Sequence, residues 1–347
     1  MTHELKKIFE GAIFAKHNGL KTVLATVVAL DGSSYRKPGV RMLIMENGKM
    51  IGAVSGGCVE KEIVSQTETV FKTGVSKMMT YDGRYRLGCE GILYILIESF
   101  QPNEALTQSF YKGIKARSSF KIASYFKKKE GIIPDIGSLI TLEDTTYSFS
   151  GQVNGFNKAT DSSLSVFTQK MPPCFKLIIM GAEHDAVQLC QYASLTGWEV
   201  TIISTPTDSK TLSNFPEADE FLTISPEEMD IRFIDNQTAV ILMTHNFAQD
   251  LRHLVALSKT VTAYIGLLGP VRRRDDLLSQ LMEYCPNVKD EFLDCIHGQS
   301  GLNIGSVTPQ EIAISIISEI LAVIRNQVPM SLKKKVGRIH APWSKKE

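Results

Sequence analysis

The central signal of this sequence is the segment FKLIIMGAEHDAVQLCQYASLTGWEVTIIS at residues 175–204. A short apolar run ends at a glycine, and a helical pattern then leads to a second glycine and a second apolar run. This order of strand, turn, helix and strand opens a parallel α/β unit. Further apolar runs at 239–243 and 262–267 alternate with helical stretches at 247–258 and 271–284. We therefore expect a Rossmann-like, doubly wound parallel sheet in the second half of the chain.

The first half of the chain has a less regular pattern. The predicted elements are helices at 3–18 and 58–72 and strands at 22–30, 40–45, 50–54, 92–100, 120–125 and 138–147. Hairpin signals such as Asn47-Gly48 indicate an α+β domain with a mixed or antiparallel sheet. The polar stretch at 151–173 is rich in Ser, Thr, Asn and Gly and ends in Pro172-Pro173, which predicts a linker. The expected domains are therefore 1–150 and 174–347.

Length and composition limit the classes of protein to consider. A chain of 347 residues is long enough for two domains, and its 43% apolar and 22% charged residues are typical of globular proteins. The formal net charge of +1 makes nucleic acid or an anionic membrane a poor default partner. No run approaches the roughly 18 apolar residues of a membrane span, and no signal peptide is recognisable, so we expect a cytoplasmic protein. The six cysteines include no CxxC pair, which disfavours zinc ribbons and disulfide scaffolds, and no metal site is predicted.

The most suggestive site in the first half is the sequence Ser55-Gly56-Gly57-Cys58-Val59-Glu60. Glycines between a strand and a helix expose backbone N–H groups that can bind an anion. A cysteine in the first helical turn has a depressed pKa, because the helix dipole favours a thiolate. Cys58 is therefore a candidate reactive or ligand-holding sulfur, and the alternative is a structural cysteine beside an ordinary glycine turn.

A second glycine-rich loop, at residues 31–41, combines hydroxyl groups with basic side chains. Ser33, Ser34, Arg36 and Arg41 suit a loop that surrounds a phosphate or a polar heterocycle. A third loop, Leu87-Gly88-Cys89-Glu90-Gly91, precedes the strand at 92–100. Each loop alone is more often an ordinary turn, but three such loops in one small domain favour a binding function.

In the second half, the turn Gly181-Ala182-Glu183-His184 occupies the place of a dinucleotide-binding fingerprint. Gly181 and His184 are candidate binding residues, but Glu183 puts a side chain and a negative charge where backbone normally approaches pyrophosphate. The second strand ends at Ser204, where an acidic residue would bind ribose hydroxyls. Both departures argue against tight binding of NAD(P).

Further candidates follow the later strands of the predicted parallel sheet. Ligands of open parallel sheets bind beyond the carboxyl ends of the strands, and His245, Gly266, Gly269 and Arg273 are expected there. His245 is a candidate acid, base or hydrogen-bond donor, although a histidine after a strand is often only a cap. Arg273 belongs to a run of three arginines that suits either phosphate contact or a solvated helix start.

Together these stretches resemble the XdhC/CoxI family, the accessory proteins of molybdenum hydroxylases such as xanthine dehydrogenase. The resemblance runs over about 20–94 and 177–321. Its motifs are GSSYRKPGVRM at 32–42, SGGCVE at 55–60, LGCEG at 87–91, THN at 244–246, YIGLLGPVRRR at 264–274 and GLNIGSVTPQEIAISI at 301–316. No single motif is decisive, whereas six in the same order are specific.

The resemblance implies a protein that binds molybdenum cofactor, protects it during sulfuration and delivers it to an apo-hydroxylase. By this analogy the residues for cofactor contact or sulfur handling are Arg36, Arg41, Ser55, Gly56, Gly57, Cys58 and Glu60. The expected partners are a xanthine dehydrogenase-like molybdenum hydroxylase, a cysteine desulfurase and a second copy of the chain. We expect a maturation factor rather than an enzyme. The alternatives are an NAD(P)-dependent Rossmann oxidoreductase and a regulatory or scaffold protein that holds no cofactor.

Overall fold

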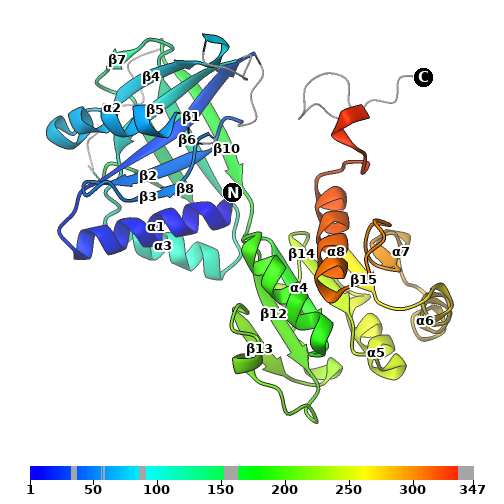
Figure 1. Cartoon of the computed structure of the whole chain (residues 1–347). Helices are drawn as coiled ribbons and strands as arrows, with labels where there is room; N and C mark the ends of the chain where they lie inside the picture. The colour runs from blue at the N-terminus through cyan, green and yellow to red at the C-terminus, as the bar shows by residue number, and fades with distance from the viewer. Residues whose placement is uncertain (33–36, 56, 58, 86–90, 152–162, 335–347) are drawn as a thin grey trace. The chain divides into compact units, whose positions relative to one another are not determined.

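The structure is a computed structural model that describes all residues except 33–36, 56, 58, 86–90, 152–162 and 335–347. The chain divides into two compact units, Met1–Pro173 and Cys174–Glu347 (Figure 1). Each unit has its own buried clusters of apolar side chains, so each is described by itself. Within the described residues, no helix has the length and apolar character needed to cross a membrane.

Over its described residues, the N-terminal unit consists of two antiparallel sheets and three α-helices. The helices are α1 (Thr2–His17), α2 (Glu60–Thr73) and α3 (Glu104–Lys115), with the 3-10 helix η1 (Gly83–Tyr85). The strands are β1 (Thr22–Asp31), β2 (Arg41–Met45), β3 (Met50–Gly52), β4 (Lys77–Asp82), β5 (Ile92–Ser99), β6 (Phe120–Phe126), β7 (Gly131–Ile132), β8 (Gly137–Leu142), β9 (Thr145–Ser148) and β10 (Ser165–Met171).

Strand pairing in this unit is antiparallel throughout the described residues, which decides between the mixed and antiparallel sheets expected from the sequence. The six-stranded sheet has the order β3-β2-β1-β5-β4-β7, and the four-stranded sheet has the order β10-β6-β8-β9. Helices α1 and α3 lie together (Figure 1), where Phe9 stacks on Phe110 at 3.9 Å between ring centroids. Helix α2 packs on the opposite face of the larger sheet through Ile63 and Val70.

The linker expected at 151–173 is wrong over residues 165–171, because these residues form strand β10. They pair with β6 along the whole strand, from Ser165 opposite Phe126 to Met171 opposite Phe120. The strand lies at the edge of its sheet and is largely exposed, so its polar residues remain in solvent while Gln169 and Met171 are buried. A polar composition therefore concealed a strand that tertiary pairing stabilises.

The C-terminal unit has the predicted Rossmann-like architecture. Its strands are β11 (Lys176–Met180), β12 (Glu199–Ser204), β13 (Glu220–Thr223), β14 (Thr238–Leu242), β15 (Tyr264–Leu267) and β16 (Ile296–Gly298). Its helices are α4 (His184–Leu195), α5 (Phe247–Leu257), α6 (Val271–Tyr284), α7 (Asp290–Asp294) and α8 (Pro309–Ile324), with 3-10 helices η2 (Leu212–Asn214), η3 (Pro226–Glu228), η4 (Ile231–Phe233) and η5 (Leu332–Lys334). The parallel sheet has the order β13-β12-β11-β14-β15-β16, so strand order reverses between β11 and β14.

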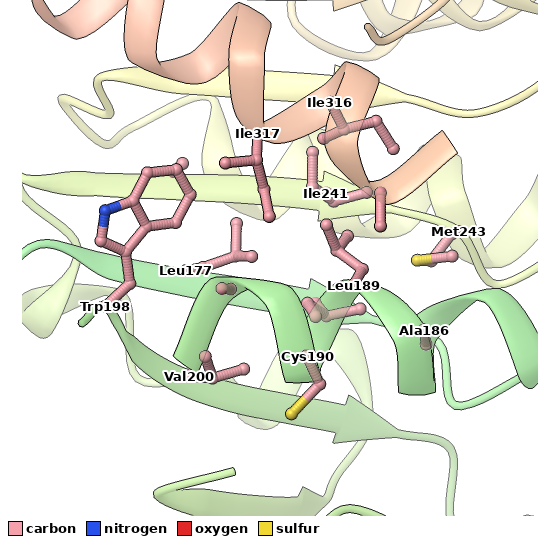
Figure 2. Close-up of a cluster of buried hydrophobic side chains, with 14 of the residues drawn as sticks. Leu177, Ala186, Leu189, Cys190, Trp198, Val200, Ile241, Met243, Ile316 and Ile317 are labelled. Atoms are coloured by element: carbon pink, nitrogen blue, oxygen red, sulfur yellow. The ribbon is translucent and has the colours of Figure 1, made fainter. Parts of the chain in front are cut away.

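Two apolar layers cover the faces of the parallel sheet. Figure 2 shows the first layer, in which Leu189 of α4 and Ile316 of α8 converge on Leu177 and Ile241 of the central strands. Helices α5 and α6 supply the second layer on the other face. The covered sheet leaves the carboxyl ends of β11 and β14 as the place where polar loops gather.

A buried carboxylate, Glu98 of β5, ties the two sheets of the N-terminal unit together. Its Oε2 accepts from Ser138 N at 2.7 Å and its Oε1 accepts from Ser138 Oγ at 2.6 Å. Only 2% of Glu98 is exposed, and this burial raises the pKa of its carboxyl group to about 7, although the hydrogen bonds from Ser138 and the charge of Arg41 oppose the rise. Because the pKa is higher in the folded state, Glu98 stabilises the fold less as pH rises from about 4.5 to about 7.

We therefore predict that Glu98→Gln has a pH-dependent effect on stability. The neutral amide resembles the protonated acid at pH 5 but avoids the buried charge at pH 8. The difference in melting temperature, variant minus parent, should be more positive at pH 8 than at pH 5. The corresponding change in the free energy of unfolding between the two pH values is at most about 3 kcal/mol. Thermal unfolding of both proteins at the two pH values tests this expectation, and equal differences would contradict it.

Candidate functional site

A clamp of hydrogen bonds precedes helix α2. Glu60 is the first residue of the helix, and its carboxylate turns back to accept from Ser55 N at 2.6 Å and from Ser55 Oγ at 2.5 Å. Ser55 Oγ in turn accepts from Gly57 N at 3.1 Å and from Val59 N at 3.3 Å. Four hydrogen bonds among these residues therefore hold the described part of the loop at the start of the helix.

Glu60 has the properties of a positioning residue. It is only 8% exposed. Burial alone would raise the pKa of its carboxyl group, but hydrogen bonds from Ser55 and from the backbone of Glu60 and Gly57 hold the pKa below its usual value. Gly57 has φ +116°, and no atom of the described residues lies within 4 Å of the position that its Cβ would occupy. Hydrogen bonds to Glu60 thus hold the loop, and the loop is accessible beside Gly57.

Several predicted site residues lie outside the described part of the chain. They are Ser33, Ser34, Arg36, Gly56 and Cys58. The helix expected at 58–72 begins at Glu60 with Val59 as its N-cap, so the first turn of the described helix follows Cys58 in the sequence. The expected sulfur chemistry at Cys58 therefore stays a prediction.

Two described cysteines have surroundings that suppress reactivity. Burial, with the nearby acidic residues Glu217 and Asp219, raises the pKa of the Cys190 thiol to about 12. Burial also raises the pKa of Cys295. Both side chains are therefore neutral thiols at physiological pH, which is unsuitable for nucleophilic chemistry.

Arg41 lies inside the N-terminal unit rather than in an open loop. Its side chain is 7% exposed, and Nη1 donates to Gly39 O at 2.9 Å and to Gln169 Oε1 at 2.7 Å. Burial lowers the pKa of the guanidinium to about 10, and Nε and Nη2 have no hydrogen-bond partner among the described residues. Arg41 thus holds strand β10 against the start of β2, and this burial argues against direct contact with a cofactor.

In the C-terminal unit, the structure brings the turn after β11 against the end of β14. Gly181 has φ +118°, and a Cβ there would lie 2.4 Å from Met243 O. This close approach alone requires a glycine at position 181. Both turns border the crevice at which the strand order reverses.

The acidic side chain in this turn has a cationic partner. Glu183 is the N-cap residue of α4, and its Oε1 lies 3.1 Å from Nζ of Lys210, which follows β12. His184 is the first residue of α4 and is exposed. The carboxylate and the ammonium group therefore stand where a dinucleotide-binding domain offers bare backbone to pyrophosphate.

A buried ion pair organises the loop after β14. Asp250 of α5 is 1% exposed, and its Oδ2 accepts from Arg273 Nη2 at 2.7 Å. Its Oδ1 accepts from Thr244 Oγ1 at 2.6 Å, and Thr244 Oγ1 accepts from Asn246 N at 3.2 Å. The side chain of Arg273 therefore supports the loop, and a phosphate would have to compete with Asp250 for it.

The remaining candidates in the crevice have different environments. His245 is exposed and has φ +56°, so the loop presents its ring to solvent in a conformation that few residues adopt. Gly266 is buried, and a Cβ there would meet Ser300 Oγ at 2.4 Å and Ile241 Cδ1 at 2.5 Å. Gly269 has φ +118°, and a Cβ there would lie 2.7 Å from Cδ of Arg273. Packing therefore explains both glycines without a ligand.

Sequence reasoning missed three residues that organise these sites. Asp250 and Gln169 bind the predicted site residues Arg273 and Arg41 across long stretches of chain, and Lys210 binds Glu183 of the fingerprint turn. For Asp250 a signal was present, because the residue shares the buried helix face of Leu254 and Leu257. A charged residue on an apolar helix face indicates a buried partner.

Comparison with protein families supports the assignment that these motifs suggest. A model described as the XdhC Rossmann domain matches residues 177–320, and a model described as the XdhC and CoxI family matches residues 15–82. The chain belongs to the XdhC and CoxI family. The two matches fall in the two compact units, so both halves of the chain carry family features.

Relatives of this family match nearly the whole chain. A protein of Bacillus subtilis (strain 168), named as a probable xanthine dehydrogenase subunit, is 29% identical over 330 residues, with 87% of this chain and 92% of that protein covered. The molybdenum cofactor insertion chaperone PaoD of Escherichia coli (strain K12) is 24% identical over 331 residues, with coverage of 94% and 91%. The crystal structure of a xanthine dehydrogenase from Bacillus halodurans has a TM-score of 0.72 and 26% identity, covering 92% of this chain and 96% of that chain.

Proposed function

We propose that this protein is an accessory factor for a molybdenum hydroxylase of the xanthine dehydrogenase type. It binds molybdenum cofactor transiently, assists sulfuration of the cofactor and delivers it to the apo-enzyme. Its role is maturation of another protein rather than turnover of a metabolite. Family membership and the relative named as a molybdenum cofactor insertion chaperone support this proposal.

The observation that carries the proposal is the clamped loop before α2. Ser55 and Glu60 fix the loop through hydrogen bonds, and the space beside Gly57 is free of atoms from the part of the chain that the structure describes. In the sequence, Cys58 lies between Gly57 and Val59, whose N–H groups both donate to Ser55 Oγ. These N–H groups are engaged inside the clamp, so the space beside Gly57 is the part of the loop that a polar ligand can approach. The bound cofactor would supply the metal centre that receives sulfur. Ser55 and Glu60 position the loop, and Cys58 is the candidate sulfur-handling residue.

The crevice of the C-terminal unit supports a role other than NAD(P)-dependent oxidation. Glu183 and Lys210 form an ion pair at the turn that would receive pyrophosphate. Ser204 stands at the end of β12, where ribose hydroxyls would need an acidic acceptor. We expect no tight binding of NADH. In this proposal the crevice instead contacts the molybdenum cofactor or the recipient enzyme and holds it in position.

We propose that the protein binds two other proteins and also forms a homodimer. The recipient is a xanthine dehydrogenase-like hydroxylase, and the sulfur donor is a cysteine desulfurase. The chain acts in the cytoplasm as a homodimer. Co-purification with each partner and the mass of the protein in solution are the measurements that test these statements.

Cys58→Ser tests the proposed sulfur chemistry. We expect this variant to activate an apo-hydroxylase at least tenfold less than the parent, because serine has no thiolate that can accept or transfer sulfur. Binding of molybdenum cofactor, measured by retention on gel filtration, should change by less than threefold. Cys285→Ser is the matched control, since Cys285 is a partly buried cysteine of the other unit.

Two outcomes would contradict parts of this assignment. Unchanged activation by Cys58→Ser would make that cysteine structural. If the parent protein itself retained no molybdenum cofactor and did not activate the hydroxylase, the proposed function would fall. In that case, co-purification with a hydroxylase would favour a scaffold role.

A further inference from the structure

The N-terminal unit contains a cavity whose lining includes none of the residues of the Ser55–Glu60 clamp. It has a volume of about 170 Å³ and lies where the end of α2, strand β5, the loop between β7 and β8, and the end of β9 meet. An apolar cavity of about 150 Å³ is large enough to hold benzene, so this one can hold a ring system. It lies beyond the far end of α2 from the Ser55–Glu60 clamp, about 20 Å along the helix. It is therefore a separate site.

The wall of the cavity contains a carboxylate without an ionic partner. Glu98 lines the cavity, and its two oxygens accept one hydrogen bond each, both from Ser138. A carboxylate has about four acceptor positions, so about two remain unused. Among the described residues no cationic nitrogen lies within ion-pair distance, and Arg41 acts only from farther away. A buried carboxylate in this state is costly unless a ligand supplies donors.

A glycine keeps this carboxylate accessible from the cavity. A Cβ at position 137 would lie 3.2 Å from Oε2 of Glu98, closer than an ordinary contact. Gly137 belongs to the cavity wall and directly precedes Ser138, which holds both oxygens of Glu98. A larger residue there would press on the carboxylate and reduce the space in front of it.

The rest of the wall suits a flat polar ring. Val75, Pro134 and Ile136 supply apolar surface for the faces of a ring. Ser76, Ser138, Ser148 and Ser150 line the same cavity, and a serine oxygen that donates elsewhere can still accept from a polar group at a ring edge. The wall is thus more polar than apolar, and such convergent polar groups fix the orientation of a small organic molecule in its site.

The donor set disfavours a metal ion at this place. Divalent cations in proteins usually take several carboxylate or imidazole ligands. Among the described residues no group of three or more His, Cys, Asp and Glu side chains is arranged to hold one. Glu98 is the buried carboxylate of this wall, whereas Asp135 is exposed, and one buried carboxylate is better matched by two adjacent N–H donors, which can bind both of its oxygens.

We propose that this cavity binds a flat heterocycle through an edge with adjacent N–H donors, directed at Glu98. Guanine and pterins share this chemistry, because each has a ring N–H beside an exocyclic amino group. The carboxylate accepts both hydrogens, the serine hydroxyls bind neighbouring ring atoms, and Val75 and Ile136 contact the ring faces.

The test is calorimetric titration of the full chain with four small probes. Two carry the 2-amino group, 2-amino-4-oxopteridine and guanosine, and two have an oxygen in its place, 2,4-dioxopteridine and xanthosine. We expect saturable binding of the aminopteridine, of guanosine, or of both, with one molecule per chain. The dioxopteridine should bind at least tenfold more weakly than the aminopteridine, and if guanosine binds, xanthosine should bind at least tenfold more weakly.

Two variants locate the binding site. Glu98→Gln should weaken binding of the preferred probe at least tenfold, because the substitution replaces one of the two acceptor oxygens by an NH₂ group, which would face a donor of the ligand. Asp135→Asn is the matched control, since it removes an exposed carboxylate from the same wall. Asn tolerates the backbone at this position, where φ is +63°. We expect this control to change the affinity by less than twofold.

The outcomes separate clearly. Binding of the aminopteridine alone identifies a pterin site, and binding of guanosine alone identifies a nucleoside site. Absence of binding by both would overturn the proposal, as would equal weakening by the two variants or equal affinity for the amino and oxo probes. If Glu98→Gln does not fold, the comparison of probes on the parent protein decides. Cofactor delivery that persists without probe binding would leave the proposed function intact while removing this site.

Discussion

Arg273→Ala is expected to lower the free energy of unfolding of the C-terminal unit by about 3 kcal/mol. The change removes the only cationic partner of Asp250 among the described residues and leaves that carboxylate 1% exposed, with Thr244 as a neutral donor. Denaturant unfolding followed by tryptophan fluorescence measures the loss, because Trp198 is buried in this unit. The loop that presents His245 should also become more mobile, since Asp250 holds Thr244.

Two further variants make this prediction specific. Arg272→Ala removes the adjacent, exposed arginine and should change stability by less than about 0.5 kcal/mol. Adding Asp250→Asn to Arg273→Ala should recover part of the loss, because the double variant has no unpaired buried charge. If Arg273→Ala were as mild as Arg272→Ala, the ion pair would not be important for stability.

Gly181→Ala should prevent normal folding of the C-terminal unit, with a cost of at least about 3 kcal/mol. The added Cβ would lie 2.4 Å from Met243 O and 3.0 Å from Cα of Thr244, which are backbone atoms that cannot rotate away. Strand β11 is hydrogen-bonded to this region through Met243 N and Met180 O at 2.8 Å, so neither chain can easily move apart. Low soluble yield and a large fall in melting temperature are the expected readouts.

Gly305→Ala is the matched control for this substitution. Gly305 also has a positive φ, +76°, but within the described residues no atom lies within 4 Å of its Cβ position. Its replacement should cost only the conformational penalty, about 1–2 kcal/mol. Equal losses for the two variants would show that backbone conformation, rather than the contact between two strand ends, explains the glycine at position 181.

The two halves of the chain differ in how far the sequence predicts their structure. In the C-terminal unit, β11, α4 and β12 follow from residues 175–204, because buried parallel strands are short apolar runs between clear turn signals. In the N-terminal unit the hairpin at Asn47-Gly48 and the end of α2 at Gly74 were also predictable. Strand β10 was not, because an exposed edge strand has the composition of a loop.

The candidate sites were predicted as segments, whereas the roles of individual side chains were not. The Ser55–Glu60 segment is a local arrangement, and the four hydrogen bonds of its clamp join residues within five positions of one another. Arg41 was expected in a binding loop, but it is buried against Gln169, 128 positions away. Nothing in the local pattern around position 41 could indicate that partner.

The sequence by itself determined the parallel sheet of the second half, the positions of the glycine loops and the family. These properties depend on periodicity and turn chemistry over a few residues, which are local. Only the tertiary structure decided which charged groups are buried and what they bind, as for Glu98 with Ser138 and Asp250 with Arg273. Burial and pairing depend on strand register and helix packing between distant segments, and these are established only when the whole unit folds.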